Sequence, residues 1–316
     1  MHRVGKVLSS TPHAWNSSTP KRSTNFLKST LQLGIELRLW VAGCVTGLSV
    51  FSYRALTEGS LSEKDVFTSN APFFVVFLST LALYNLDGTL DAPRAGKARR
   101  RKVHLTLTAF SCAALFYFLI QLPALARTIA LGGAIFSALY AIPLTWGRKR
   151  TSLKKIAGLK APFVGVAVAV AVVIVPILSR SPVVFWPAFS LLIITLALYC
   201  TANAFLFDIP DRQVDKLNDV PTQASLRGLD STKRLCTVLC LAGMLFSLLI
   251  GFTTIGPLKA AYQVNTAASL FFLGVLLLIS SHRVNETTSR TAVAWRVDGA
   301  LLVPYVVQFV FEQWWV

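Results

Sequence analysis

Long runs of apolar residues, separated by short polar and basic segments, make up most of the chain. Such runs exceed what one soluble core needs and match the length of a helix that crosses a bilayer. Nine stretches of suitable length can be marked: Leu33–Ala55, Ala71–Leu86, Val103–Leu122, Ala124–Leu144, Ala161–Leu178, Val183–Phe207, Arg234–Ile255, Ala260–Ser281 and Ala292–Phe311. The pattern predicts an all-α polytopic membrane protein, with a domain of nine transmembrane helices over residues 33–316.

Basic residues are strongly asymmetric between alternate loops. They gather after the second segment (Arg94, Lys97, Arg99, Arg100, Arg101 and Lys102) and after the fourth (Arg148, Lys149, Arg150, Lys154, Lys155 and Lys160). Short loops rich in Lys and Arg stay on the cytoplasmic side, so we expect a cytoplasmic amino terminus and an external carboxyl terminus. The net charge of +17 is thereby explained by membrane topology, and a nucleic-acid partner is not expected.

The first 32 residues contain Ser, Thr, Lys and Arg and no acid. We expect them to form a disordered, basic cytoplasmic tail, although an organelle transit peptide has the same composition. A bacterial inner membrane is therefore the favoured location, with an organelle membrane as the alternative. The five cysteines fall in or beside apolar segments without metal-ligand spacing and are interpreted as packing residues.

Two clusters of acids stand at the ends of the second and sixth apolar segments. The first contains Asn85, Asp87 and Asp91, and the second contains Asp208, Asp211 and Asp215. Spacings of three and four residues place the acids of each cluster on one helical face. Carboxylates near hydrocarbon are costly, and oxygen ligands suit Mg²⁺, so the clusters predict a divalent cation that holds a phosphorylated substrate. Solvated helix ends are the simpler alternative for one cluster, but two clusters argue against it.

These motifs resemble the UbiA superfamily of intramembrane prenyltransferases, which are nine-helix bundles with two aspartate-rich motifs on the cytoplasmic side. The second motif matches as Asn203 followed by Asp208-x-x-Asp211-x-x-x-Asp215, and then Val220-Pro-Thr222. In the first motif Asp87 and Asp91 keep the family spacing, but Asn85 precedes Asp87 by two residues instead of four. Tyr140-x-x-Pro143, followed by Arg148 and Lys160, resembles a third family segment.

The resemblance implies a Mg²⁺-dependent enzyme that moves an isoprenoid chain from a prenyl diphosphate to a lipophilic acceptor in the membrane, with aromatic compounds among the candidate acceptors. It implies that Mg²⁺ binds the catalytic acids Asp87, Asp91, Asp208, Asp211 and Asp215. The substrate would be bound by Asn85, Tyr140, Arg148, Lys160, Asn203 and Arg38, while Arg296 and Asp298 are further charges at a similar depth. A UbiA-type terpene cyclase is one alternative, and a transporter or non-catalytic membrane protein is another.

Overall fold

The computed structural model describes residues 33–34, 38–57, 70–91, 98–142, 144–146, 149–151, 156–180, 186–217, 220–253 and 257–315. The expected amino-terminal tail, residues 1–32, lies outside this part of the chain. The longer helices are α2 (Leu39–Thr57), α4 (Ala71–Asp91), α5 (Ala98–Leu119), α6 (Ala124–Ala141), α7 (Lys160–Arg180), α8 (Trp186–Leu217), α10 (Leu229–Gly251), α11 (Pro257–Arg283) and α13 (Val303–Trp315). Shorter elements are α9 (Gln223–Arg227), α12 (Arg290–Val293), the π-helical η2 (Ala294–Asp298) and the 3₁₀-helical η3 (Gly299–Leu302).

The predicted helical class is confirmed, with one small addition. Strands β1 (Leu144–Trp146) and β2 (Lys149–Thr151) pair as an antiparallel hairpin between α6 and α7. The basic loop predicted after the fourth apolar segment contains this hairpin.

Eight helical segments within the described residues are long and apolar enough to cross a membrane, and these support an integral membrane protein. The fourth predicted segment forms a shorter apolar helix, Ala124–Tyr140. Nine crossings therefore stay a prediction, because α6 is shorter than the eight candidate spans.

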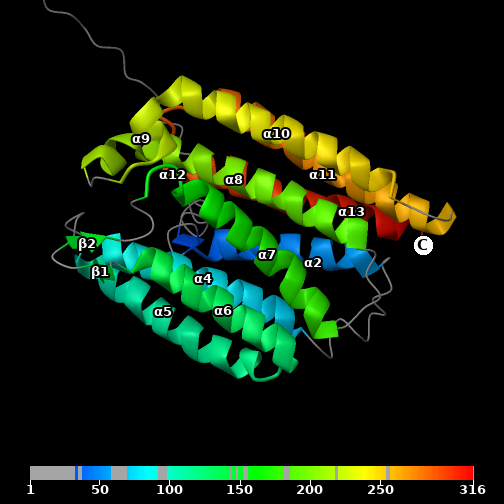
Figure 1. The fold of residues 1–316 in the computed structure, drawn as a ribbon, viewed down its shortest axis with the longest axis horizontal. Coiled ribbons are helices and arrows are strands. Elements are labelled where there is room, and N and C mark those ends of the chain that lie inside the picture. Colours follow the sequence, from blue (N-terminus) through cyan, green and yellow to red (C-terminus); the bar gives the residue numbers. More distant parts are fainter. Residues whose placement is uncertain are drawn as a thin grey trace, which may run out of the picture.

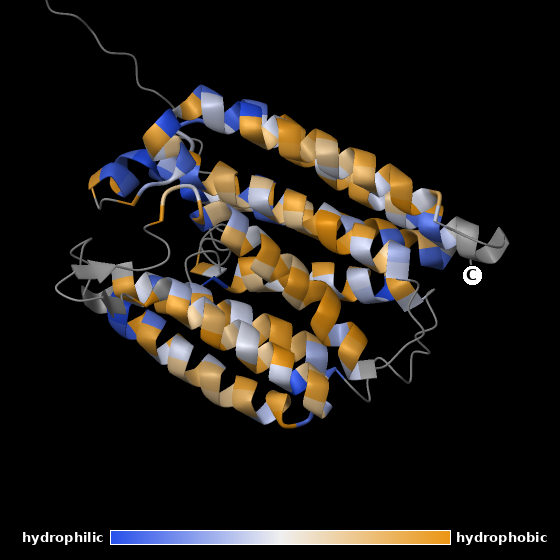
Figure 2. Cartoon of the chain, in the orientation of Figure 1, coloured by the Kyte–Doolittle hydropathy of each residue, from blue (hydrophilic) through white to orange (hydrophobic). Residues whose placement is uncertain are grey.

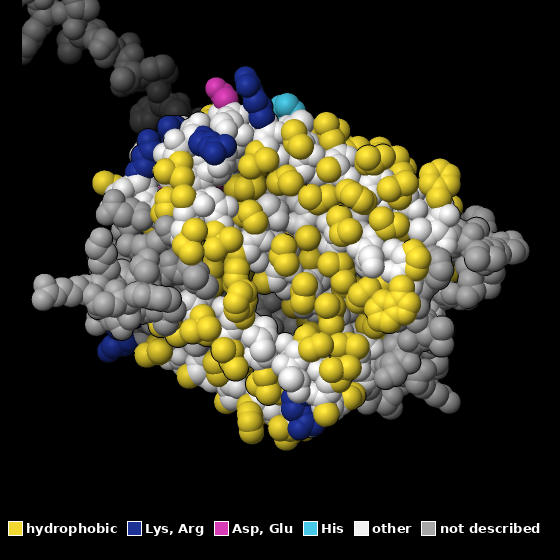
Figure 3. Space-filling view, in the orientation of Figure 1, with side chains coloured by type: hydrophobic (Ala, Val, Ile, Leu, Met, Phe, Trp, Pro, Cys, Tyr) yellow, Lys and Arg dark blue, Asp and Glu magenta, His cyan; other side chains and the backbone are white. Residues whose placement is uncertain are grey.

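The helices lie side by side as an elongated bundle with α7 joining its two parts (Figure 1). Helices α4, α5 and α6 lie on one side of α7, and α8, α10 and α11 lie on the other. Helix α7 packs against α2, α4, α6 and α8. Hydrophobic residues make up most of the middle of the bundle, and hydrophilic residues concentrate toward the end formed by α9 and the last turns of α8 (Figure 2). On the face shown in Figure 3, Lys and Arg lie near the margins of an otherwise hydrophobic surface, as a lipid-facing bundle requires.

Small residues permit the closest helix contacts. A Cβ atom at Gly165 of α7 would lie 2.6 Å from the backbone nitrogen of Thr201 in α8. A Cβ atom at Gly243 of α10 would lie 2.4 Å from the ring of Tyr199, which is fully buried in α8. Close backbone approach of this kind is how membrane helices gain packing without a hydrophobic driving force.

Helix α8 does not end near Phe207, where the apolar run ends. It continues to Leu217 with Pro210 inside it, so the whole second acid cluster is helical. The proline removes one backbone hydrogen bond but does not end the helix. The polar turns stay ordered because Asp208 and Asp215 are buried against the start of α7.

The last membrane segment is irregular. Between α12 and α13 the chain forms the π-helical turn η2 and the 3₁₀ turn η3. The indole nitrogen of Trp40 donates a hydrogen bond of 3.0 Å to the carbonyl oxygen of Ala294, and the rings of Trp40 and Trp295 lie 4.4 Å apart. This turn buries Asp298 inside the bundle, and π-helical turns are frequent at functional sites.

Candidate functional site

Lys160 joins two carboxylates of the second acid cluster. Its Nζ atom lies 2.6 Å from Oδ1 of Asp208 and 3.8 Å from Oδ2 of Asp215. Lys160 opens α7, and the two acids lie two turns apart on the face of α8 that packs against α7. A buried carboxylate needs a partner, and Lys160 supplies it for both acids.

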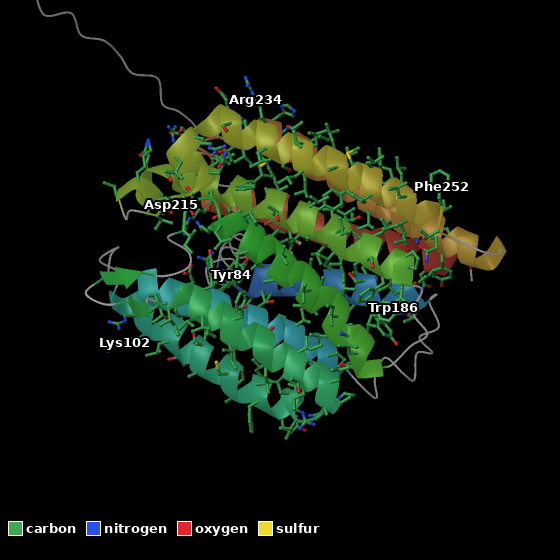
Figure 4. All side chains as sticks on the ribbon, viewed as in Figure 1. Tyr84, Lys102, Trp186, Asp215, Arg234 and Phe252 are labelled. Atoms are coloured by element: carbon green, nitrogen blue, oxygen red, sulfur yellow. The ribbon has the colours of Figure 1, made fainter. Side chains whose placement is uncertain are left out.

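Asp215 retains unused hydrogen-bonding capacity. Its Oδ2 atom is buried and has no hydrogen-bond partner among the described residues. The backbone nitrogen of Val220 binds the main-chain oxygen of Asp215 at 2.9 Å, and the Thr222 side chain caps α9 by accepting from the nitrogen of Ser225. The Val220-Pro-Thr222 segment thus folds back on the end of α8 and encloses Asp215, which Figure 4 places beside α9.

Asp211 forms a bidentate ion pair with Arg290, the first residue of α12. The Nε atom of Arg290 donates to Oδ1 of Asp211 at 2.6 Å, and its Nη2 atom donates to Oδ2. The neighbouring Arg212 is ion-paired with Glu286. Two adjacent residues of α8 are therefore tied to the polar segment that precedes the last membrane helix.

The first cluster lies at the end of α4, where Asn85 is fully buried. Its Nδ2 atom donates to the carbonyl oxygen of Leu81 at 2.9 Å, and its Oδ1 atom lies 2.7 Å from Nδ1 of His104 in α5. Asn85 therefore connects α4 to α5 through its side-chain oxygen. Asp87 is half-buried, and the side chain of Asp91 lies outside the described part of the chain.

Tyr140 lies between the two clusters. Its ring stacks on Phe163 of α7, with centroids 4.4 Å apart and ring planes within 5° of parallel. Asp87 of α4 and Asp208 of α8 are both close enough to interact with it electrostatically. Arg148, predicted to approach the same substrate, lies outside the described residues.

A small pocket opens deeper in the bundle, next to the π-helical turn. Nδ2 of Asn203 donates to Oδ1 of Asp298 at 3.4 Å, and Arg38 is close enough to Asp298 to interact electrostatically. Arg38 adopts φ 64° just before α2, and its Nε atom is buried without a hydrogen-bond partner among the described residues. The pocket is lined by Val41, Val45, Tyr84, Val164, Val168, Cys200, Asn203, Asp298 and Leu301.

Sequence reasoning missed several of these connections. Arg290 and Glu286 resemble ordinary residues of a short polar loop, and His104 resembles another residue of a basic segment. The only signal for His104 was a polar side chain inside a predicted span. Arg296, which was considered beside Asp298, is exposed, and the partner that the structure gives Asp298 is Asn203.

Within the described residues no three His, Cys, Asp or Glu side chains lie close enough to hold a metal ion by themselves. Magnesium often binds one or two carboxylates and completes its shell with water and substrate phosphate, so the donors still suit this ion. The Oδ2 atom of Asp215, which has an ion pair with Lys160 but no hydrogen bond among the described residues, is one such donor. The chemistry of the acids fits a metal that arrives with a phosphorylated substrate.

Comparison with known proteins defines the class of fold. No protein-family model matches the sequence, and no curated protein sequence matches it. A structure of digeranylgeranylglyceryl phosphate synthase superposes with a TM-score of 0.55 at 16% sequence identity, over 87% of this chain and 98% of the other. A UbiA homolog from Aeropyrum pernix K1 superposes with a TM-score of 0.58 at 13% identity, over 86% of this chain and 98% of the other. The chain therefore shares the all-helical fold of these two structures, one of which is described as a UbiA homolog. The sequence resemblance to the UbiA superfamily agrees with this likeness in fold.

Proposed function

We propose that this protein is an intramembrane prenyltransferase, which moves an isoprenoid chain from a prenyl diphosphate to a lipophilic acceptor. The observation that carries the proposal is the arrangement of Lys160 between Asp208 and Asp215 at the polar end of an apolar bundle. The likeness in fold to two structures of this class, over nearly their whole length, supports it.

Lys160 is suited to bind the diphosphate. Its ammonium group is held by two carboxylates, yet its side chain is still 28% exposed, so it can also donate to a phosphate oxygen. A cation placed in advance where negative charge develops on a leaving group is the strongest contribution such a site can make. In this proposal Lys160 orients the diphosphate at the start of α7.

Magnesium is the proposed cofactor. Asp208 and Asp215 would hold it on α8, and Asp87 and Asp91 would hold it at the end of α4. Bound there with the diphosphate, the ion would neutralise charge on the phosphate oxygens. Asp211 is ion-paired with Arg290, so this acid has to release Arg290 before it can bind the metal ion with the other acids.

The reaction breaks the bond between the allylic carbon and the diphosphate oxygen, and the electron pair leaves with the diphosphate. A nucleophilic carbon or oxygen of the acceptor then bonds to the allylic carbon and releases one proton. Apolar residues such as Val41, Val45 and Val168 around the pocket would keep water from the cation. Tyr140 and Phe163 present stacked rings near the acids, where an isoprenoid cation would be stabilised.

The proposal is tested by diphosphate release from purified full-length protein with Mg²⁺ and a mixture of geranyl, farnesyl and geranylgeranyl diphosphates. The assay is run with and without a membrane-lipid extract as the source of acceptor. Release that requires the extract is the expected result. Release without extract would assign a terpene cyclase, and no release under either condition would contradict both enzyme assignments.

A further inference from the structure

A second set of polar side chains, each with a buried nitrogen or oxygen atom, lies at the other end of the bundle, away from the aspartates. It consists of Gln263, Asn265, Thr266 and Ser269 on α11, Gln308 and Glu312 on α13, and Arg54 on α2. Arg54 is ion-paired with Glu312. Glu312 follows Asp298 by fourteen residues, which corresponds to roughly 20 Å along a helix. We call this set the α11–α13 polar cluster.

Helix register places the members of this cluster along the contact between α11 and α13. Near the start of α11 the ring of Tyr262 lies 6.5 Å from that of Phe311, which is near the end of α13. Helix α11 also contacts η2 and η3, which precede α13, so α11 and α13 run antiparallel. Moving one turn inward from this ring pair brings Asn265 and Thr266 level with Gln308. The ion pair between Arg54 and Glu312 then lies at the outer end of the contact between α11 and α13, which we call the seam.

The inner members are buried and unsatisfied. Gln308 is 1% exposed, and within the described part of the chain neither its Oε1 nor its Nε2 atom has a hydrogen-bond partner. The same holds for the hydroxyl groups of Thr266 and Ser269 and for Nδ2 of Asn265. Buried polar groups without partners are rare in native proteins, and a bound molecule that supplies the hydrogen bonds is one of the explanations for them.

The two hydroxyl groups also differ from several others in the bundle. Ser280 donates back to the carbonyl oxygen of Leu276 four residues earlier, and Thr80 does the same to Val76. Thr266 and Ser269 do not make this bond, and neither does the buried Ser111 of α5. The hydroxyl groups of Thr266 and Ser269 are therefore available to another partner between α11 and α13.

We propose that the α11–α13 polar cluster binds water molecules that enter from the membrane face opposite the aspartates. Gln308 offers both a donor and an acceptor, and Thr266 and Ser269 offer hydroxyl groups that can do either, which suits a neutral hydrogen-bonding ligand. Further along α11, Leu273 and Leu277 are fully buried and apolar, so the hydrated seam ends there. Water at this end is then separated from the proposed reaction site.

Thiol labelling of the full-length protein tests this assignment. The substitution Ser269→Cys is nearly isosteric, and a thiol reacts with a water-soluble methanethiosulfonate only where water permits its ionisation. Leu273→Cys, one turn further along the same helix, is the matched control. The native Cys240, fully buried in α10, is an internal control in both variants. Modified positions are read by peptide mass spectrometry.

Cysteine at position 269 should react at least about tenfold faster than Cys240, while cysteine at position 273 should not exceed Cys240. Equal rates at position 269 and Cys240 would overturn the proposal. Reaction at position 269 only after removal of bound lipid would assign the site to a lipid hydroxyl group and also overturn it.

A second measurement does not depend on cysteine chemistry. Gln308→Leu should lower the unfolding temperature, because it removes the hydrogen bonds between the Gln308 amide and bound water. Gln313→Leu, the same change at an exposed position of α13, is the control and should have little effect. An unchanged or higher unfolding temperature for Gln308→Leu would show that no water is bound to the Gln308 amide and would contradict the proposal.

Discussion

Lys160 is the residue on which the proposed site depends most. Lys160→Met removes the cation beside Asp208 and Asp215, so diphosphate release should fall by about a hundredfold or more. Stability should also fall, by about 3 kcal/mol, because the buried Asp208 loses its partner. Both effects can be measured on purified protein, by diphosphate release and by thermal unfolding.

A double variant isolates the contribution of Lys160 to stability. Lys160→Met combined with Asp208→Asn removes both charges, so much of the lost stability should return. Turnover should stay low, because Asp208 is itself a proposed metal ligand. A double variant that was as unstable as Lys160→Met alone would show that the ion pair with Asp208 is not what Lys160 contributes to stability.

At the scale of residues, the sequence predicted the acids but not their partners. Asp208, Asp211 and Asp215 were recognisable because carboxylates at helical spacing are unusual beside apolar runs. Arg290 follows Asp211 by 79 positions, and His104 follows Asn85 by 19, so no local pattern connects either pair. Such pairs are set by helix packing, which only the structure provides.

The contact between α7 and α8 is the element-scale feature that positions Lys160 against the acids. Gly165→Ala should destabilise the protein by about 1–3 kcal/mol, because the new methyl group would meet the backbone of Thr201, which cannot move aside. Turnover should also fall, because the contact between α7 and α8 positions Lys160 beside the acids. Thermal unfolding and diphosphate release measure the two effects.

Gly132→Ala in α6 provides the control for this prediction. A Cβ atom there has no neighbour within 4 Å, so the change should be neutral or slightly stabilising. Equal effects of Gly165→Ala and Gly132→Ala on stability would show that the close contact between α7 and α8 does not require a glycine at position 165.

Helix positions followed well from hydropathy, whereas helix ends and irregular turns did not. The prediction placed the end of the sixth segment near Phe207, but α8 extends to Leu217 because buried ion pairs hold its polar turns. The π-helical turn that buries Asp298 has no sequence signal, since its widening depends on contacts such as the hydrogen bond from Trp40 to Ala294.

The topology of the whole molecule is open to a direct test. Nine crossings with a cytoplasmic amino terminus place the carboxyl terminus on the external face. An alkaline phosphatase fused after Val316 should then be active, and a fluorescent protein that folds only in the cytoplasm should stay dark. The opposite pattern would mean an even number of crossings, with the shorter α6 as the helix that fails to span.

The central claim is that two acid clusters, one on α4 and one on α8, together support a metal-dependent prenyl transfer. The most direct measurement is Mg²⁺-dependent diphosphate release by Asp87→Ala, Asp211→Ala and the parent protein, with Asp230→Ala, an exposed acid at the start of α10, as the control. Both cluster variants should lose about a hundredfold or more of the activity at little cost in unfolding temperature, and the control should keep it. Full activity in both cluster variants would contradict the account.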